Sequence, residues 1–280
     1  MNATASLERF TAWVGRTETR RDWAAPAPLV SLSALLDRDD APPQPGDEAP
    51  PLAHWLYFLP AYRQSEAGAD GHAGEGAGLL PEMPLPRRMW AGSRLEFLRP
   101  LRVGSEIERV STILDVKVKS GRSGALVFVT VRHEVRDGGG TVLTDEHDIV
   151  FREPGTLANP PTPAPVQAPW RREIRPDPLL LFRYSAVTFN GHRIHYDHPY
   201  VTKVEGYPGL VVHGPLLATL LLDLFARNDP RRVTSFTFRA LSPVFDTTPF
   251  TVHGTPDADG AKLWIRRDDG ALCMEATAAA

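Results

Sequence analysis

Hydrophobic and polar residues alternate along the last third of the chain in a way typical of β-strands. Short turns at 256–260 and 268–270 interrupt this alternation. The predicted strands are Val233–Ala240, Pro249–Gly254, Lys262–Arg267 and Leu272–Thr277, with Leu179–Val187 as a further strand upstream. Because short turns join antiparallel neighbours, the pattern predicts an antiparallel sheet.

A long apolar segment, residues 209–226, precedes these four strands. From Pro215 to Phe225 it is apolar on nearly every side of a helix, and a helix without a polar face must be surrounded by protein. His213, Pro215 and Asp223 interrupt the segment, which argues against a membrane span. We therefore expect a buried helix that the sheet wraps.

The N-terminal half repeats this order of elements. A helix-compatible segment, Leu29–Leu36, comes before the predicted strands Leu95–Leu98, Glu106–Lys119, Ala125–Arg136 and Thr141–Phe151. In each half an apolar pair ends a strand just before a proline, as Leu95-x-Phe97-x-x-Pro100 and as Phe238-x-Ala240-x-x-Pro243. The shared order and this echo predict an internal duplication.

Composition locates the boundary between the two halves. The 280 residues include 27 prolines, and eight of them lie in Pro154–Pro178. We therefore expect an N-terminal repeat over residues 1–153, a stiff extended linker over 154–178 and a C-terminal repeat over 179–280. The predicted fold class is α+β, a double hot dog in which each repeat is a long central helix wrapped by an antiparallel sheet.

Charge and cysteine content exclude several classes of protein. The net charge of −3 argues against a general nucleic-acid binder, and the single Cys273 excludes an internal disulfide and a cysteine-based metal site. The first 21 residues mix arginine with glutamate and lack the apolar region of a signal peptide. We expect a cytoplasmic protein that binds neither nucleic acid nor membrane, and the oligomeric state, a homo-oligomer included, stays open.

The densest polar cluster is Thr188–Asp197, with the sequence TFNGHRIHYD. Four of the nine histidines lie between His192 and His213. The cluster follows a predicted strand and runs into Pro199, so we expect a loop or short irregular helix at a sheet end, where functional residues are common. Three hypotheses compete. The histidines His192, His195 and His198 bind a metal, they are half-buried structural residues, or one of them is a general acid–base.

The third hypothesis is favoured by a resemblance. Asn190-x-x-x-x-His195-x-Asp197 resembles the hydratase-2 motif of MaoC-like dehydratases, in which an aspartate precedes the active-site histidine by five residues. The segment EGYPGLVVHGPL that follows resembles the family's entry into its central helix. Arg88-Met89-Trp90-Ala91-Gly92 and the proline-rich linker resemble the double-hot-dog branch, which includes mesaconyl-CoA and itaconyl-CoA hydratases and type 2 hydroxyacyl-thioester dehydratases.

The resemblance implies roles for individual residues. His195 would carry the acid–base chemistry, and Asn190 would orient a water molecule, because an amide cannot take a proton. Gly214, at the start of the apolar helix, would offer backbone N–H groups to the developing oxyanion, although this turn can also be a plain helix start. Other candidates are supporting residues (Asp197 and His213) and substrate-binding residues (Arg193, Arg88 and Trp90). No metal or cofactor is implied.

The activity implied by the resemblance is reversible hydration of a short enoyl-CoA thioester. The leading substrates are mesaconyl-CoA and itaconyl-CoA, each giving citramalyl-CoA. The alternatives are a 3-hydroxyacyl-thioester dehydratase of fatty-acid synthesis and a non-catalytic acyl-CoA-binding module. A thioesterase is disfavoured. Hot-dog thioesterases place a carboxylate on the central helix, and the only acid on the predicted helix is Asp223, more than two turns past Gly214. The N-terminal repeat has no Asn or Asp five residues before a histidine, so we expect it to be non-catalytic and to shape the substrate and CoA pocket.

Overall fold

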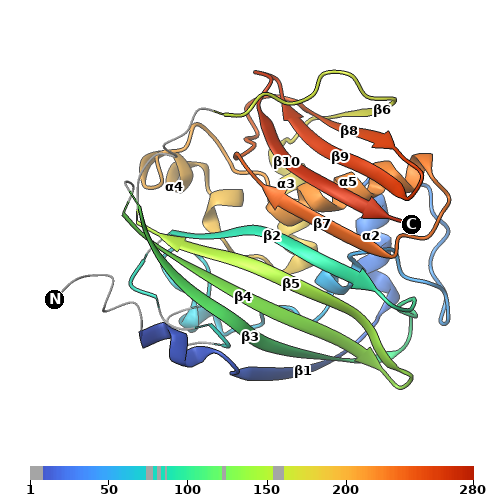
Figure 1. The fold of residues 1–280 in the computed structure, drawn as a ribbon, viewed down its shortest axis with the longest axis horizontal. Coiled ribbons are helices and arrows are strands. Elements are labelled where there is room, and N and C mark those ends of the chain that lie inside the picture. Colours follow the sequence, from blue (N-terminus) through green and yellow to red (C-terminus); the bar gives the residue numbers. More distant parts are fainter. Residues whose placement is uncertain (1–8, 74–77, 81–82, 86, 122–123, 154–160) are drawn as a thin grey trace.

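Ten strands form one continuous antiparallel sheet in the computed structural model, which describes residues 9–73, 78–80, 83–85, 87–121, 124–153 and 161–280 (Figure 1). The strands are β1 Thr17–Trp23, β2 Arg87–Phe97, β3 Glu106–Gly121, β4 Gly124–Asp137, β5 Gly140–Arg152, β6 Trp170–Ile174, β7 Ser235–Ala240, β8 Phe250–Pro256, β9 Gly260–Arg267 and β10 Leu272–Ala279. All the strands predicted downstream of residue 230, and all those predicted in the N-terminal half, are present.

The order of the strands is that of two repeats joined at the centre. The sheet runs β1-β3-β4-β5-β2-β7-β10-β9-β8-β6, so each half has the same order from its outer edge inward. At the centre β2 pairs with β7, and Leu95 lies opposite Phe236. The prolines of the repeated motif, Pro100 and Pro243, follow these two central strands. This is the predicted double hot dog.

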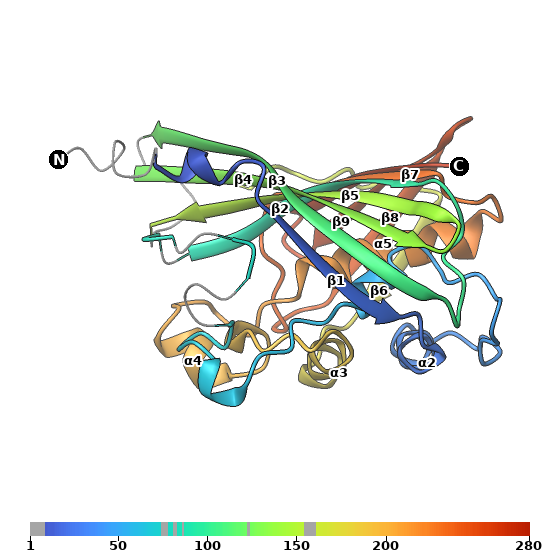
Figure 2. The same ribbon diagram turned by 90° about the horizontal axis from the view of Figure 1, so that it is seen from below.

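Within the described residues, four α-helices lie beside the sheet, together with four short 3-10 segments. The helices are α2 Pro26–Leu35, α3 Pro178–Thr188, α4 His198–Lys203 and α5 Gly214–Asn228, and the 3-10 segments are η1 Arg9–Trp13, η2 Ala53–Leu56, η3 Gln64–Glu66 and η4 Arg193–His195. Helices α2, α3 and α4 lie side by side along one face of the sheet (Figure 2). Helix α5 packs against β6, β8, β9 and β10.

Helix α5 confirms the predicted buried helix. Every residue from Leu216 to Phe225 is buried, and the helix belongs to the main hydrophobic core. The helix of the N-terminal repeat is the shorter of the two, since α2 has 10 residues and α5 has 15. Among the helices of the described residues, none is long and apolar enough to cross a membrane.

The prediction of a strand at Leu179–Val187 is wrong, because this segment is helix α3. The carboxylate of Asp177 accepts a hydrogen bond from the backbone N–H of Leu180 at 2.8 Å, and Pro178 occupies the first turn. Both are helix-start signals. A short apolar run fits either element, and here the cap decides it.

The predicted linker is also partly wrong. Its first residues, 154–160, lie outside the described part of the chain, but Trp170–Ile174 forms strand β6 at the sheet edge, paired with β8. This stretch contains no proline, and an edge strand tolerates the prolines that flank it. Residues before it are also attached to the sheet, since the indole N–H of Trp264 donates to the carbonyl of Pro165 at 3.1 Å. The C-terminal half of the sheet therefore begins earlier than residue 179.

Candidate active site

The polar cluster forms the predicted loop with a short 3-10 turn, but it lies between helices α3 and α4 and does not follow a strand at a sheet end. Phe189 ends α3 in the left-handed conformation, with φ 49°. The side-chain carbonyl of Asn190 then accepts a hydrogen bond from the backbone N–H of His192 at 2.9 Å. The next residues form η4, which carries His195 towards the start of α5.

His195 is buried with one ring nitrogen engaged. Its side chain is only 7% exposed, and Nδ1 lies 2.7 Å from the carbonyl oxygen of Val211. Because a carbonyl only accepts, Nδ1 carries the proton and Nε2 keeps a free lone pair. Burial, and next the nearby His192, lower the pKa of His195 to about 3. The imidazole of His195 is therefore neutral at physiological pH.

His213 stacks on His195 at the N-cap of α5. The ring centroids are 3.6 Å apart, and Nε2 of His213 lies 2.9 Å from the hydroxyl of Ser185 on α3. The next residue, Gly214, begins the helix, and a methyl group added to it would meet no atom within 4 Å. The N–H groups of a first helical turn have no partner within the helix. The N-terminus of α5 thus has N–H groups without helical partners and open space at Gly214, and it lies close to His195.

Two of the predicted residues hold the loop together. The side-chain carbonyl of Asn190 is engaged by a backbone N–H of the turn. Within the described residues no hydrogen bond joins Asn190 to His195. Asp197 caps α4 by accepting from the N–H of Tyr200 at 3.0 Å, and it also accepts from the guanidinium of Arg193. Asp197 therefore supports the loop that carries His195.

The three predicted substrate-binding residues differ in their surroundings. Arg193 is neutralised by Asp197, and its Nη1 donates to the carbonyl of Ala69 at 2.9 Å. Trp90 is packed into the core against Trp55, with ring centroids 5.0 Å apart, and its indole N–H donates to the carbonyl of Gly92. Arg88 on β2 is exposed, and its positive charge helps to lower the pKa of His192.

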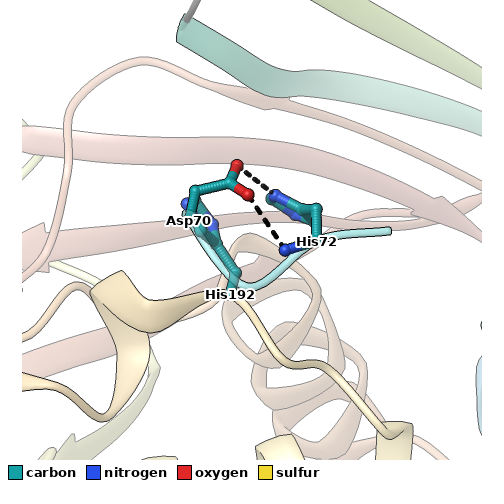
Figure 3. A group of neighbouring side chains, drawn as sticks. All are labelled: Asp70, His72 and His192. Carbon is teal, nitrogen blue, oxygen red and sulfur yellow. Dashed lines mark hydrogen bonds and ion pairs between the residues drawn. The ribbon is translucent and has the colours of Figure 1, made fainter. Parts of the chain in front are cut away.

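Two residues missed in the sequence analysis lie in this site, Asp70 and His72 (Figure 3). Nδ1 of His72 lies 2.8 Å from the carboxylate of Asp70. The ring of His72 lies 4.1 Å from that of His192, which in turn lies 5.4 Å from that of His195. Asp70-Gly71-His72 lies in a Gly/Ala-rich stretch. Its acid precedes the histidine by two residues, whereas the family motif has a spacing of five.

The family model of hydroxyacyl-thioester dehydratase type 2 matches residues 52–246, which include all of these site residues. The chain belongs to this family. It is 45% identical over 271 residues to the mesaconyl-C(4)-CoA hydratase of Chloroflexus aurantiacus, and the match covers 96% of each chain. The predicted MaoC-like resemblance is confirmed, and this family member is a hydro-lyase that acts on thioesters.

Solved structures confirm the fold of this family member. A MaoC-like dehydratase of Phytophthora capsici matches with a TM-score of 0.69 at 16% identity, over 97% of each chain. A Mycobacterium tuberculosis protein described as a double hot dog matches with a TM-score of 0.56 at 16% identity, over 95% of this chain and 96% of that one.

The group of side chains in Figure 3 is relevant to the hypothesis of a metal site. Asp70, His72 and His192 could each offer one ligand atom, and these atoms lie within 4.8 Å of one another. However, the carboxylate of Asp70 is already paired with His72, and Arg88 adds a positive charge close to the same groups. A positive neighbour opposes cation binding. We therefore interpret Asp70 and His72 as a carboxylate–imidazole pair and assign no metal to them.

Proposed function

We propose that this protein reversibly hydrates mesaconyl-C4-CoA, or a C5 dicarboxylic enoyl-CoA close to it such as itaconyl-CoA, to citramalyl-CoA. The single observation that carries the chemistry is the hydrogen bond between Nδ1 of His195 and the carbonyl of Val211. It leaves Nε2 as a free base beside the open N-terminus of α5. The substrate is suggested by the 45% identity to a mesaconyl-C(4)-CoA hydratase.

In the hydration direction His195 acts first. Its Nε2 accepts a proton from a water molecule while the water oxygen forms a bond to the β-carbon of the substrate. The electron pair of the double bond moves towards the thioester oxygen, which becomes enolate-like. The N–H of Gly214 and the positive end of α5 stabilise that oxygen, and one such donor is worth about 3 kcal/mol.

Asn190 orients the attacking water. Its carbonyl is occupied by the N–H of His192, so its NH2 group is the part left to hydrogen-bond a water oxygen. This arrangement supports a water-positioning role for Asn190 and leaves His195 as the base.

A dicarboxylic substrate also needs a positive group beside the reacting carbon. In mesaconyl-C4-CoA the β-carbon carries the methyl group and the free carboxylate, so this carboxylate must lie close to His195. Arg193 is neutralised by Asp197, whereas Arg88 is exposed and close to His192. We therefore assign the carboxylate to Arg88. The N-terminal repeat, which contributes Arg88, shapes this part of the pocket.

Direct assays test this function. Purified protein is offered mesaconyl-C4-CoA, itaconyl-CoA and crotonyl-CoA, and the products are identified by mass spectrometry. We expect hydration of the dicarboxylic substrates to exceed that of crotonyl-CoA. His195→Gln should reduce kcat at least 100-fold, since general acid–base groups contribute roughly 10²–10⁴-fold. His198→Gln, an exposed histidine of the same region, is the matched control and should change kcat little. No turnover of any of the three substrates would refute the proposal.

A second candidate is the dehydration of 3-hydroxyacyl thioesters of fatty-acid synthesis. The match to the type 2 hydroxyacyl-thioester dehydratase model favours it, and the same His195 and Gly214 would serve the reverse reaction. A preference for long 3-hydroxyacyl chains on a carrier protein over C5 dicarboxylic CoA esters would support this candidate against the first.

A further inference from the structure

Adding water to a double bond requires two proton transfers, and the residues described so far account for one. A base takes a proton from water, and an acid gives a proton to the α-carbon. Where the family motif has an aspartate, this chain has Asn190, which cannot transfer a proton. His213 is fully buried, with its Nε2 on Ser185. The proton donor is therefore another residue of the site.

Asp70 and His72 have the geometry of a supported acid. The carboxylate of Asp70 contacts both Nδ1 of His72, at 2.8 Å, and the backbone N–H of the same residue, at 3.0 Å. These contacts orient the imidazole and leave Nε2, on the far side of the ring from Asp70, as the nitrogen that can present a proton. The side chain of His72 is 32% exposed, so it can regain a proton from solvent. His195, at 7%, is shielded from such exchange.

The turn that carries His72 is attached to the catalytic loop. The backbone N–H of Arg193 donates to the carbonyl of Asp70 at 2.8 Å, and its guanidinium donates to the carbonyl of Ala69. The two backbones approach so closely that a Cβ on Gly71 would lie 1.9 Å from the carbonyl oxygen of Gly191. Only a glycine fits this contact. His72 is thus held against the loop that presents His192 and His195.

We propose that His72, oriented by Asp70, is a second catalytic residue that donates a proton to the α-carbon of the substrate during hydration. This inference rests on the proposed function and deepens it. It gives the N-terminal repeat, which we expected to be non-catalytic, one half of the acid–base pair.

The two histidines transfer one proton each. Nε2 of His195 takes one proton from water, and the remaining hydroxide forms the C–O bond at the β-carbon. The enolate electron pair then forms a C–H bond at the α-carbon with the proton on Nε2 of His72. At this point the substrate has gained one water molecule and become the product, His195 is protonated and His72 is neutral. His195 loses its proton to solvent as product leaves, and His72 regains one. In dehydration the two residues exchange roles.

Only one of the charged or titratable groups described around His72 is a carboxylate. The charged or titratable groups that face it are Asp70 and His192, with Arg88 close to both and His195 behind His192. His192 is neutral, because burial, and next His72, lower its pKa to about 3. Asp70 is therefore the negatively charged neighbour that orients the imidazole of His72.

The test is the pH profile of hydration by the full-length protein. Because a general acid must carry its proton, kcat of the wild type should fall on the alkaline side of its pH profile. His72→Gln should lower kcat at least 100-fold, with KM changed less than threefold, and should remove this alkaline limb. Asp70→Asn should also lower kcat, because it removes the carboxylate that orients the imidazole of His72. Added imidazole should restore part of the kcat of His72→Ala, which a purely structural role would not allow. His198→Gln is the control for all three.

The outcomes separate this inference from the function on which it rests. If the wild type hydrates its substrate and His72→Gln keeps its kcat and its alkaline limb, the inference is overturned while the proposed function stands. If the wild type hydrates none of the substrates, the function itself fails. Elemental analysis gives a further check. One equivalent of bound metal in the wild type that is lost in both His72→Ala and Asp70→Asn would make His72 a ligand and would also overturn the inference.

Discussion

The imidazole of His195 lies flat against the imidazole of His213, with 3.6 Å between the ring centroids and 18° between the ring planes. Nε2 of His213 is in turn within hydrogen-bond distance of the hydroxyl of Ser185, at 2.9 Å. The plane of the proposed base is therefore set by α3 and by the N-cap of α5, while its tautomer is set by the carbonyl of Val211.

Replacing His213 tests the importance of this stack. His213→Ala should lower kcat about tenfold and reduce the free energy of unfolding by about 1–3 kcal/mol, because it removes a buried aromatic contact and leaves a cavity. His213→Phe keeps the flat ring and should recover most of the kcat. Steady-state kinetics and urea denaturation of both variants measure these effects. Equal kcat values for the two variants would contradict a role for stacking.

Gly214→Ala should damage function without damaging the fold. The added methyl group meets no protein atom within 4 Å, and alanine is a better helix former than glycine. The methyl would instead occupy the space proposed for the thioester, so we expect kcat/KM to fall at least tenfold with an unchanged melting temperature. Gly138→Ala, which also points into open space, is the control. An unchanged kcat/KM in Gly214→Ala would remove this turn from the oxyanion site.

Asp223 should matter for stability and not for chemistry. Its carboxylate is only 1% exposed and pairs with three arginines, Arg38, Arg172 and Arg227. Two of these arginines also donate to the carbonyl of Leu36 at the end of α2. A carboxylate engaged in this way is unsuited to act as the nucleophile or base of a thioesterase.

Asp223→Asn should therefore cost about 3 kcal/mol of unfolding free energy, since it removes the buried negative charge that balances three partly exposed arginines. Asp269→Asn breaks a more exposed ion pair with Arg267 and should cost less than about 1 kcal/mol. Denaturant titration compares the two variants. Release of free CoA by the wild type that Asp223→Asn abolishes in a folded sample would reverse this assignment.

Buried histidines should make the protein sensitive to acid. Burial lowers the pKa of His195 to about 3, whereas in an unfolded chain the pKa is about 6.5. Below pH 6.5 the unfolded chain binds more protons, so the contribution of His195 is complete above pH 6.5 and is lost as pH falls towards 3. The free energy of unfolding should drop by about 1.4 kcal/mol per pH unit for this residue. Urea denaturation between pH 7.5 and 4.5 should show a shallower slope for His195→Gln, and equal slopes would contradict the burial argument.

The parts of the molecule predicted well from sequence are those with local causes. The strands from Val233 onward follow from period-two alternation with turn residues at short intervals. Helix α5 follows from an apolar run that begins at a glycine–proline pair, and the loop at 188–197 follows from its turn residues and Pro199. The motif around Asn190 and His195 carries the family, because it lies within a few consecutive residues.

Tertiary structure decided the rest, because those features depend on contacts between distant segments. The apolar run at 179–187 suits a strand or a helix, and its cap and its packing against α2 make it α3. Trp170–Ile174 is a strand only because β8 is there to pair with it. Ala69 and Arg193 are 124 residues apart, and their hydrogen bond helps to bring His72 to His192. No local periodicity encodes such a contact, since it arises only when the two repeats share one sheet.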